Sequence, residues 1–239
     1  LKSVEGENVK TIKKSAFVQC SNLENVDFEK VTFIKEKAFF KCEKLGTVIG
    51  KPVEIENEAF SECERLENTN FSKVVEIGTE AFKNCSHLKI VNLSHITAIG
   101  EGAFGHCYTL FNVEFPTKGK FTIGERAFID CTNLSSANLS KVTKIGKEAF
   151  KGCMDMESLT IGKCAISEEA FYDCSNLEKI SGYCYATEIG KKAFCKCINL
   201  TYVELPEAKT IKESAFEDCR NLARVTASKV SSVEANAFK

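Results

Sequence analysis

The chain has 239 residues, of which 44% are apolar, and its 32 basic and 33 acidic residues leave a net charge of −1. This near balance gives no electrostatic footprint for nucleic acid or for an anionic membrane, so neither is expected as a partner. The sequence contains no run of about 18 apolar residues and therefore predicts no membrane span in this segment.

One phrase, Ala-Phe followed at three-residue intervals by Cys and then Leu, recurs along the whole chain. Its first copy is Ala16, Phe17, Cys20 and Leu23. The equivalent phenylalanines follow at steps of 21 to 24 residues, at Phe39, Phe60, Phe82, Phe104, Phe128, Phe150, Phe171, Phe194, Phe216 and Phe238. A fixed period in this range predicts a solenoid, in which each repeat, here called a rung, packs only on its neighbours.

Each rung divides into two kinds of segment, and positions are numbered by the first rung. The run around Val91-Asn92-Leu93 alternates apolar and polar residues and predicts a short strand with one buried face. Equivalent strands should pair in parallel, about 4.8 Å apart, on the concave face of the stack. The Ile-Gly-x-x-Ala-Phe-x-x-Cys run has spacings of three and four, which predict a short α-helical or 3₁₀ turn behind each strand. We therefore expect an α/β fold, a single array over residues 1–239 of about ten 22-residue rungs.

Length differences between rungs fall in one segment, between positions 6 and 12. Two extra residues occur at Pro116–Lys120 and one at Gly182–Ala186. Because the rest of each rung must stay in register, these insertions should emerge as loops on one edge of the stack.

The cysteines predict packing rather than chemistry. Ten of the thirteen occupy one template position, which favours a column of small buried side chains. A disulfide framework would break the repeat symmetry, and zinc would need converging pairs, whereas the only close pair is Cys195 with Cys197. Off the template, Cys164 and Cys184 lie in the variable segments of adjacent rungs. We hypothesise a disulfide between them, which a Cα separation above about 7 Å would rule out.

Residues for catalysis are sparse. The three histidines, His87, His95 and His106, do not recur with a Ser, Cys or carboxylate partner. Each Ile-Gly pair is a feature of the repeat and not a phosphate-binding loop. We therefore expect no enzyme activity, no metal site and no cofactor.

The full repeat resembles a known family. The runs Ile145–Cys153 and Ile189–Cys197 match the BspA-type leucine-rich repeat closely, and the resemblance covers essentially all 239 residues. Prolines near the end of the strand, common in that family, occur here only at Pro116 and Pro206. The resemblance implies a leucine-rich-repeat solenoid and a cell-surface or secreted location. It also implies adhesion to a protein ligand, such as a host, neighbouring-cell or matrix protein, although a fold alone gives function only by analogy.

The expected contact surface is the outward side of the strands. Its side chains are small and polar, at Asp27, Asn70, Asn92, Glu114, Asn138, Thr160, Ser181, Glu204 and Thr226. Tyrosines are better anchors for a protein partner, and four of the five lie between residues 172 and 202. We hypothesise a binding patch of Tyr183, Tyr185, Tyr202 and Glu204, continued along the same edge by Glu114, Lys118 and Lys120. The alternative is that these are ordinary surface tyrosines.

Two functional classes fit the sequence. The first is a surface array for adhesion or ligand recognition. The second is an intracellular, cytoplasmic scaffold for protein partners, favoured by cysteines with no evident pairing. The chain starts at template position 1 and shows no recognisable polar caps, so we expect a segment of a longer array or a form that stacks end to end.

Overall fold

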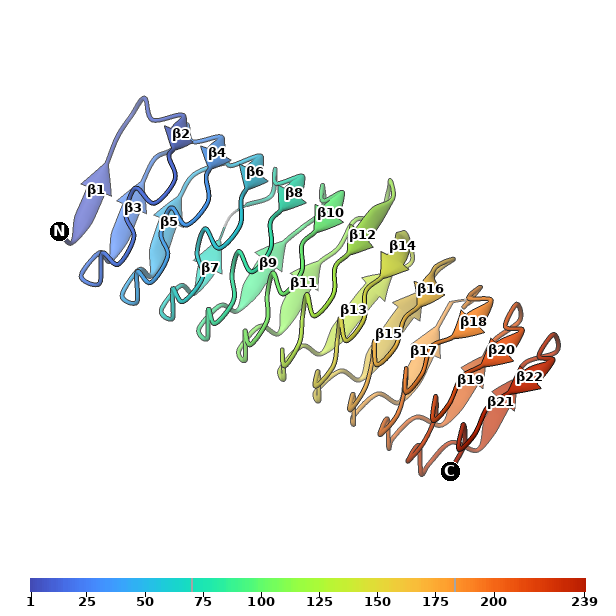
Figure 1. Ribbon diagram of the computed structural model, residues 1–239. Helices are drawn as coiled ribbons and strands as arrows, with labels where there is room; N and C mark the ends of the chain where they lie inside the picture. The colour runs from blue at the N-terminus through green and yellow to red at the C-terminus, as the bar shows by residue number, and fades with distance from the viewer. Residues whose placement is uncertain (70, 183) are drawn as a thin grey trace.

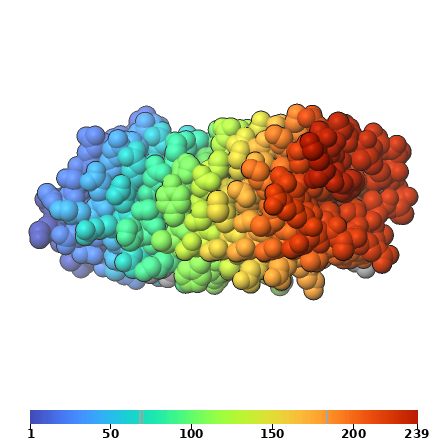
Figure 2. Space-filling view, turned by 90° about the horizontal axis from the view of Figure 1, so that it is seen from below, coloured from blue at the N-terminus to red at the C-terminus, as the bar shows by residue number. Residues whose placement is uncertain are grey.

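The computed structural model describes residues 1–69, 71–182 and 184–239. These residues form an elongated stack of rungs, with the two termini at opposite ends (Figure 1). The space-filling view shows the same rod from another side (Figure 2). Each rung contributes two short strands, and both strands pair in parallel with their equivalents in the neighbouring rungs. The predicted solenoid of stacked rungs with parallel strands is therefore confirmed.

The odd-numbered strands form one side of the rod, here called the strand face. A first sheet contains β1 (Ser3–Glu5), β3 (Asn25–Asp27), β5 (Thr47–Ile49), β7 (Asn68–Thr69), β9 (Ile90–Asn92) and β11 (Asn112–Glu114). A second continues it with β13 (Ser136–Leu139), β15 (Ser158–Ile161), β17 (Lys179–Ser181), β19 (Tyr202–Glu204) and β21 (Arg224–Thr226). The break between them follows the inserted residues 116–120. The predicted parallel pairing of these strands is confirmed, for example by Val4 opposite Val26.

The even-numbered strands form an uninterrupted sheet of eleven that the sequence did not predict. Its members are β2 (Thr11–Ile12), β4 (Phe33–Ile34), β6 (Glu54–Ile55), β8 (Glu76–Ile77), β10 (Ala98–Ile99), β12 (Phe121–Ile123), β14 (Val142–Ile145), β16 (Ala165–Ile166), β18 (Glu188–Ile189), β20 (Thr210–Ile211) and β22 (Ser232–Val233). In most of them a single isoleucine points inward, as Ile12 and Ile34 do. The strands are only two to four residues long, so each leaves little pattern of its own.

The expectation of a helical turn in each rung, and with it the α/β class, is wrong for the described residues, none of which is helical. Positions 13–20 form instead a chain of turns, here called the turn column. In the first rung, the N–H groups of Ala16 and Val18 donate to carbonyls three residues back. The intervening N–H group of Phe17 donates to the carbonyl of Ala38 in the next rung, at 2.8 Å. The turn column is thus a third hydrogen-bonded ladder along the rod.

The backbone shows why no helix forms. Ser15 and Gln19 have φ values of 56° and 57°, in the left-handed region. The equivalent positions are left-handed along the stack, as at Lys37 and Lys41, with φ of 56° and 59°. A right-handed helix cannot pass through two such residues spaced four apart. The bonds to the neighbouring rung hold them in this conformation.

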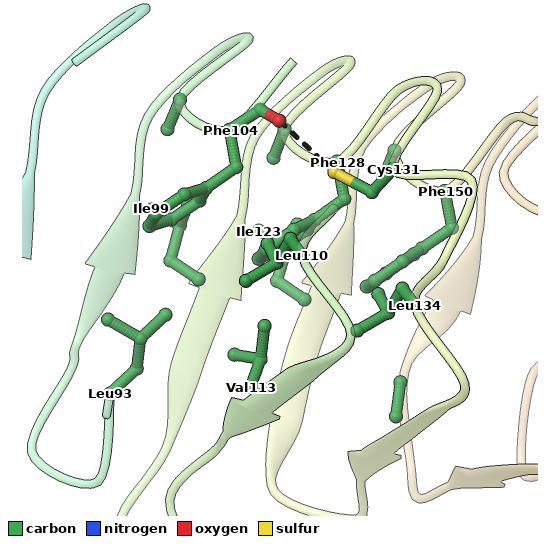
Figure 3. Close-up of a cluster of buried hydrophobic side chains, with 14 of the residues drawn as sticks. Leu93, Ile99, Phe104, Leu110, Val113, Ile123, Phe128, Cys131, Leu134 and Phe150 are labelled. Carbon is green, nitrogen blue, oxygen red and sulfur yellow. Dashed lines mark hydrogen bonds between the residues drawn. The ribbon is translucent and has the colours of Figure 1, made fainter. Parts of the chain in front are cut away.

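The core is a column of stacked phenyl rings. From Phe17 to Phe238, ring centroids in successive rungs lie 5.1–5.4 Å apart, with nearly parallel planes. Figure 3 shows Phe104, Phe128 and Phe150 of this column among the leucines and isoleucines of their rungs. Burying each ring contributes roughly 1.5–3 kcal/mol, so the column is a main source of stability.

The template cysteines lie beside this column, as predicted, and also make a bond that the sequence did not reveal. The Sγ of Cys131 donates to the carbonyl oxygen of Phe104 in the preceding rung at 3.1 Å (Figure 3). The equivalent thiols of the other rungs, of which Cys42 is the first and Cys219 the last, make the same kind of bond. Burial raises the pKa of the Cys42 thiol to about 12, so these groups stay protonated donors.

All thirteen cysteines are free. The hypothesised disulfide between Cys164 and Cys184 is therefore not formed, although both side chains are buried. Burial raises the pKa of Cys164 to about 12, with a further contribution from Cys184. Both thiols pack as small apolar groups.

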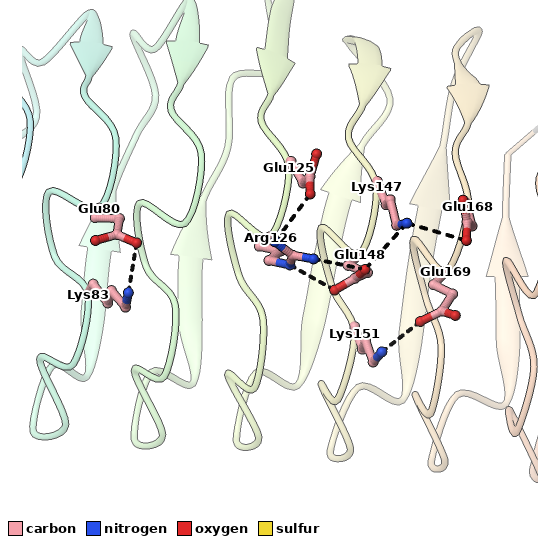
Figure 4. A network of polar contacts seen from close by, with 9 residues as sticks. All are labelled: Glu80, Lys83, Glu125, Arg126, Lys147, Glu148, Lys151, Glu168 and Glu169. Carbon is pink, nitrogen blue, oxygen red and sulfur yellow. Dashed lines mark hydrogen bonds and ion pairs between the residues drawn. The ribbon is translucent and has the colours of Figure 1, made fainter.

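The outer side of the turn column carries ion pairs between neighbouring rungs (Figure 4). Arg126 Nε lies 2.8 Å from Glu148 Oε2, and Lys151 Nζ lies 2.6 Å from Glu169 Oε2. Glu148 is a buried residue. The hydrogen bond from Arg126 lowers the pKa of its carboxyl group. Most other pairs are solvent-exposed and contribute about 0–1 kcal/mol each.

Candidate functional site

A shallow, open groove interrupts the regular strand face between β17 and β19. Its volume is about 830 Å³, and it is lined by Glu178, Lys179, Ile180, Gly182, Asn199, Thr201, Tyr202, Glu204 and Asn221. It therefore takes in two of the residues expected in the binding patch, Tyr202 and Glu204.

The groove exists because the ladder between these two strands opens. β15 and β17 share three residue pairs, and so do β19 and β21. Between β17 and β19 the pairing consists of Lys179 opposite Tyr202 alone. Beyond this pair the two strands separate, on the side where the rung carries its extra residue.

Gly182 directs the chain away from β19 at this point. In the next rung Leu205, at the equivalent position, donates its N–H to the carbonyl of Thr226 at 2.8 Å and so extends the ladder. Gly182 has a φ of +82° and approaches the preceding rung, so that a Cβ atom there would lie 2.7 Å from the carbonyl oxygen of Ile161. Only glycine combines this φ with such a close approach.

The opening exposes a residue that the repeat places in the core. Ile180 occupies the template position of Val26, Val91 and Leu159, which are at most 1% exposed, yet Ile180 is only partly buried. The other partly buried residues that pack against the core lie in the first rung and in the last two rungs. The floor of the groove is therefore apolar.

Tyr202 forms one wall, with its side chain 37% exposed. Its hydroxyl donates to Glu204 Oε1 at 2.5 Å and lies 3.5 Å from Thr226 Oγ1. The guanidinium carbon of Arg224 lies 6.0 Å from the ring centroid, within the range of a cation–π contact. These contacts hold the ring in one orientation.

The rim of the groove is polar. Glu178 and Glu204 provide carboxylates, and among the described residues neither has a cation within 4.0 Å. Asn221 Nδ2 donates to Asn199 Oδ1 at 3.4 Å on the other side. An apolar floor within a polar rim is the usual arrangement of a protein-binding hot spot.

The other expected patch residues lie elsewhere or outside the described part of the chain. Tyr183, like Asn70 on the expected strand face, is not among the described residues. Tyr185 is 41% exposed but does not line the groove. Glu114 ends β11, accepting a hydrogen bond from the Asn92 side chain.

The inserted loop is remote from the groove. Lys118 and Lys120 are exposed beside β11, which lies four strand positions from β19. At about 4.8 Å per strand this is about 19 Å. A ligand that fills the groove would not reach the loop, whereas a large protein partner would span both.

Sequence reasoning missed Ile180, Lys179, Glu178 and the two asparagines of the groove. One signal was present: Gly182 stands where most rungs carry Phe, Leu or Ile, in the same rung as the extra residue. Where glycine replaces the usual apolar residue next to an insertion, the two adjacent strands can lose their hydrogen-bonded pairing and separate.

Neither a metal cluster nor a membrane-spanning helix occurs in the described part of the chain. No group of three His, Cys, Asp or Glu side chains there could hold a metal ion. The same residues contain no helix long and apolar enough to cross a bilayer.

A parallel β-solenoid of leucine-rich rungs, with a groove on its strand face, belongs to a class of scaffolds that generally bind other proteins. Within that class the chain belongs to the BspA-type leucine-rich repeat family, whose model matches in six copies over residues 1–54, 53–178 and 163–239. This confirms the resemblance noted in the repeat. Members of this family and fold are typically scaffolds and not enzymes.

The chain is similar to three leucine-rich repeat proteins of known structure. A leucine-rich repeat protein from Bacteroides ovatus is 25% identical, with a TM-score of 0.52, covering 100% of this chain and 84% of its own. One from Eubacterium ventriosum is 22% identical, with a TM-score of 0.50, covering 100% and 82%. The Treponema pallidum leucine-rich repeat protein is 28% identical over 67% of each chain, with a TM-score of 0.48. No curated protein matches the sequence.

Proposed function

We propose that this chain is an adhesion or ligand-recognition array, displayed on a cell surface or secreted, and that it binds a protein partner through its strand face. The observation that carries the proposal is the groove between β17 and β19. Elsewhere the strand face presents mainly polar side chains, with exposed isoleucines at Ile49 and Ile90, whereas here Ile180 lies beside the ring of Tyr202 in a groove. Exposed apolar and aromatic side chains within a polar rim supply most of the binding energy in protein interfaces.

The cysteines do not favour the second candidate, a cytoplasmic scaffold. Eleven of the thirteen cysteines are buried, and nine thiols donate to backbone carbonyls. Burial raises the pKa of most of them, as for Cys219 at about 12. Thiols of this kind react slowly with oxidants because the thiolate is the reactive form. Free cysteines of this kind are therefore compatible with either compartment.

A capture experiment tests the binding proposal. The biotinylated protein is incubated with an extract of host or neighbouring cells, and the captured proteins are compared between wild type and a variant with Tyr183→Ala and Tyr202→Ala. The matched control is Tyr108→Ala, which removes a tyrosine that is 47% exposed and does not line the groove. We expect the specific partner to be lost from the double variant and retained by the control. Equal capture by all three proteins would refute the role of this site.

The location is tested separately. An antibody against the strand face should label intact cells that produce the protein. Labelling that needs permeabilised cells would favour the cytoplasmic scaffold.

A further inference from the structure

The chemistry of the groove specifies what kind of segment it takes. This inference rests on the proposed function, because it assumes a protein partner at the same site. The first element of this chemistry is the floor of the groove. Ile180 packs against the core there, and the remaining part of its surface is open to the groove. Covering it with an apolar side chain removes the remaining exposed surface from water.

Its second element is the charge around the rim. Glu157 and Glu178 are neighbours in adjacent rungs, since the N–H of Glu178 donates to the carbonyl of Glu157 at 3.1 Å. Both side chains are exposed, and within the described residues neither has a basic group within 4.0 Å. Two unpaired carboxylates one strand spacing apart repel each other, and a cation placed between them relieves the repulsion.

The third element is the asymmetry between the two walls. On the β21 side, Arg224 already lies over the Tyr202 ring and supplies a positive charge. On the β17 side, Lys179 is the only basic residue among the described residues that line the groove, and it lies beside Glu178, whose neighbour in the preceding rung is Glu157. The carboxylates there outnumber the single basic group, so a cationic group of the partner is directed toward β15 and β17.

The size of the groove limits the segment. A volume of about 830 Å³ is in the range of sites that hold a few side chains. The groove is also open, so it accepts a chain that passes across it and does not require a small molecule to be enclosed.

We propose that the groove binds a linear segment of the partner protein that combines an aliphatic or aromatic side chain with a neighbouring Lys or Arg. The apolar side chain packs on Ile180 beside Tyr202. The basic side chain lies over Glu178, between Glu157 and Glu204.

Random dodecapeptides displayed on phage test the proposal. The library is panned against the immobilised 239-residue protein, and enriched peptides are synthesised and measured by fluorescence anisotropy. Three variants are compared with wild type: Tyr202→Ala, the pair Glu178→Gln with Glu204→Gln, and the control pair Glu24→Gln with Asp27→Asn. The control removes two carboxylates at the same two template positions, here both in the second rung, far from the groove. Circular dichroism checks that each variant is folded.

We expect enriched peptides to contain an apolar residue next to Lys or Arg. Their affinity should fall about fivefold or more in Tyr202→Ala and in the groove pair, and should stay within about twofold in the control pair. Raising the salt concentration should weaken binding to wild type and have less effect on the groove pair.

Three results would overturn the inference: no enriched peptide, enriched peptides that are acidic, or affinities that the groove variants do not change. The proposed function is judged by a different experiment. If Tyr183→Ala with Tyr202→Ala abolishes capture of a cellular protein but no peptide binds, the array binds a folded surface and the linear-segment inference fails. If the peptides behave as expected but no cellular partner is captured, the proposed function fails.

Discussion

Removal of one ring from the phenylalanine column should cost most in the middle of the stack. Phe128 is fully buried, and its ring stacks at 5.1 Å on Phe104 and at 5.1 Å on Phe150. Phe115 meets the same ring edge-on at 5.8 Å. Replacing such a residue by alanine costs about 3–5 kcal/mol, since it removes buried surface and leaves a cavity. For Phe128→Ala we expect a value near the middle of this range, about 4 kcal/mol.

Phe238 provides the comparison in the same 239-residue chain. It is 48% exposed, and it stacks on Phe216 at 5.4 Å. Half of the usual burial contribution is about 1 kcal/mol, and one aromatic pair adds about 0.5–1.5. Phe238→Ala should therefore cost about 1.5–2.5 kcal/mol, below the cost at Phe128.

Urea unfolding followed by far-ultraviolet circular dichroism measures the difference. The control is Phe33→Ala, which removes a ring that is 39% exposed and outside the column. Equal shifts of the midpoint for Phe128→Ala and Phe238→Ala, or a larger shift for Phe238→Ala, would refute the account of stability as a sum over stacked rings.

Two further predictions concern ionisable groups. At about pH 8 a maleimide should leave Cys63 and Cys85 unmodified in the folded protein and label them in urea, because both are fully buried and burial raises the pKa of each thiol. Equal labelling of these cysteines, by peptide mass spectrometry, with and without urea would contradict this. At Glu148, Arg126 holds the folded-state carboxyl pKa below the ordinary value of 4.5, so its contribution to stability is present above that pH and disappears as the pH falls through the folded-state pKa. Glu148→Gln should therefore lower the urea midpoint at pH 7, and its gap from wild type should shrink as the pH falls below about 4.5, whereas a constant gap would refute the assignment.

The sequence predicted the elements that depend on residue spacing. The period gave the stack, the phenylalanine column and the parallel strands, because each of these needs the same side chain at the same place in every rung. The helical turn was a wrong prediction for a different reason. Ser15, Lys37 and Gln19 are not residues that mark a left-handed φ, and their conformation comes from hydrogen bonds to the adjacent rung.

The candidate site was partly predictable for a similar reason. Tyr202 and Glu204 could be placed on the strand face, since they alternate with Val203. Ile180 could not, because its template position indicates a core residue. Its exposure follows from the separation of β17 and β19, which depends on Gly182 and on the path of the neighbouring rung.

Besides the break between β11 and β13, the same separation gives the rod a second mechanical weak point on the strand face. Two of the three ladders still cross this boundary: β18 pairs with β20, and Phe194 donates its N–H to Ala215 at 2.8 Å. The strand face is joined there by one residue pair, so bending that opens this face breaks fewer bonds here than at a rung with full pairing. The two intact ladders would serve as the hinge. A segment bound between the walls would tie them together, and occupancy of the groove would then stiffen the rod at this point.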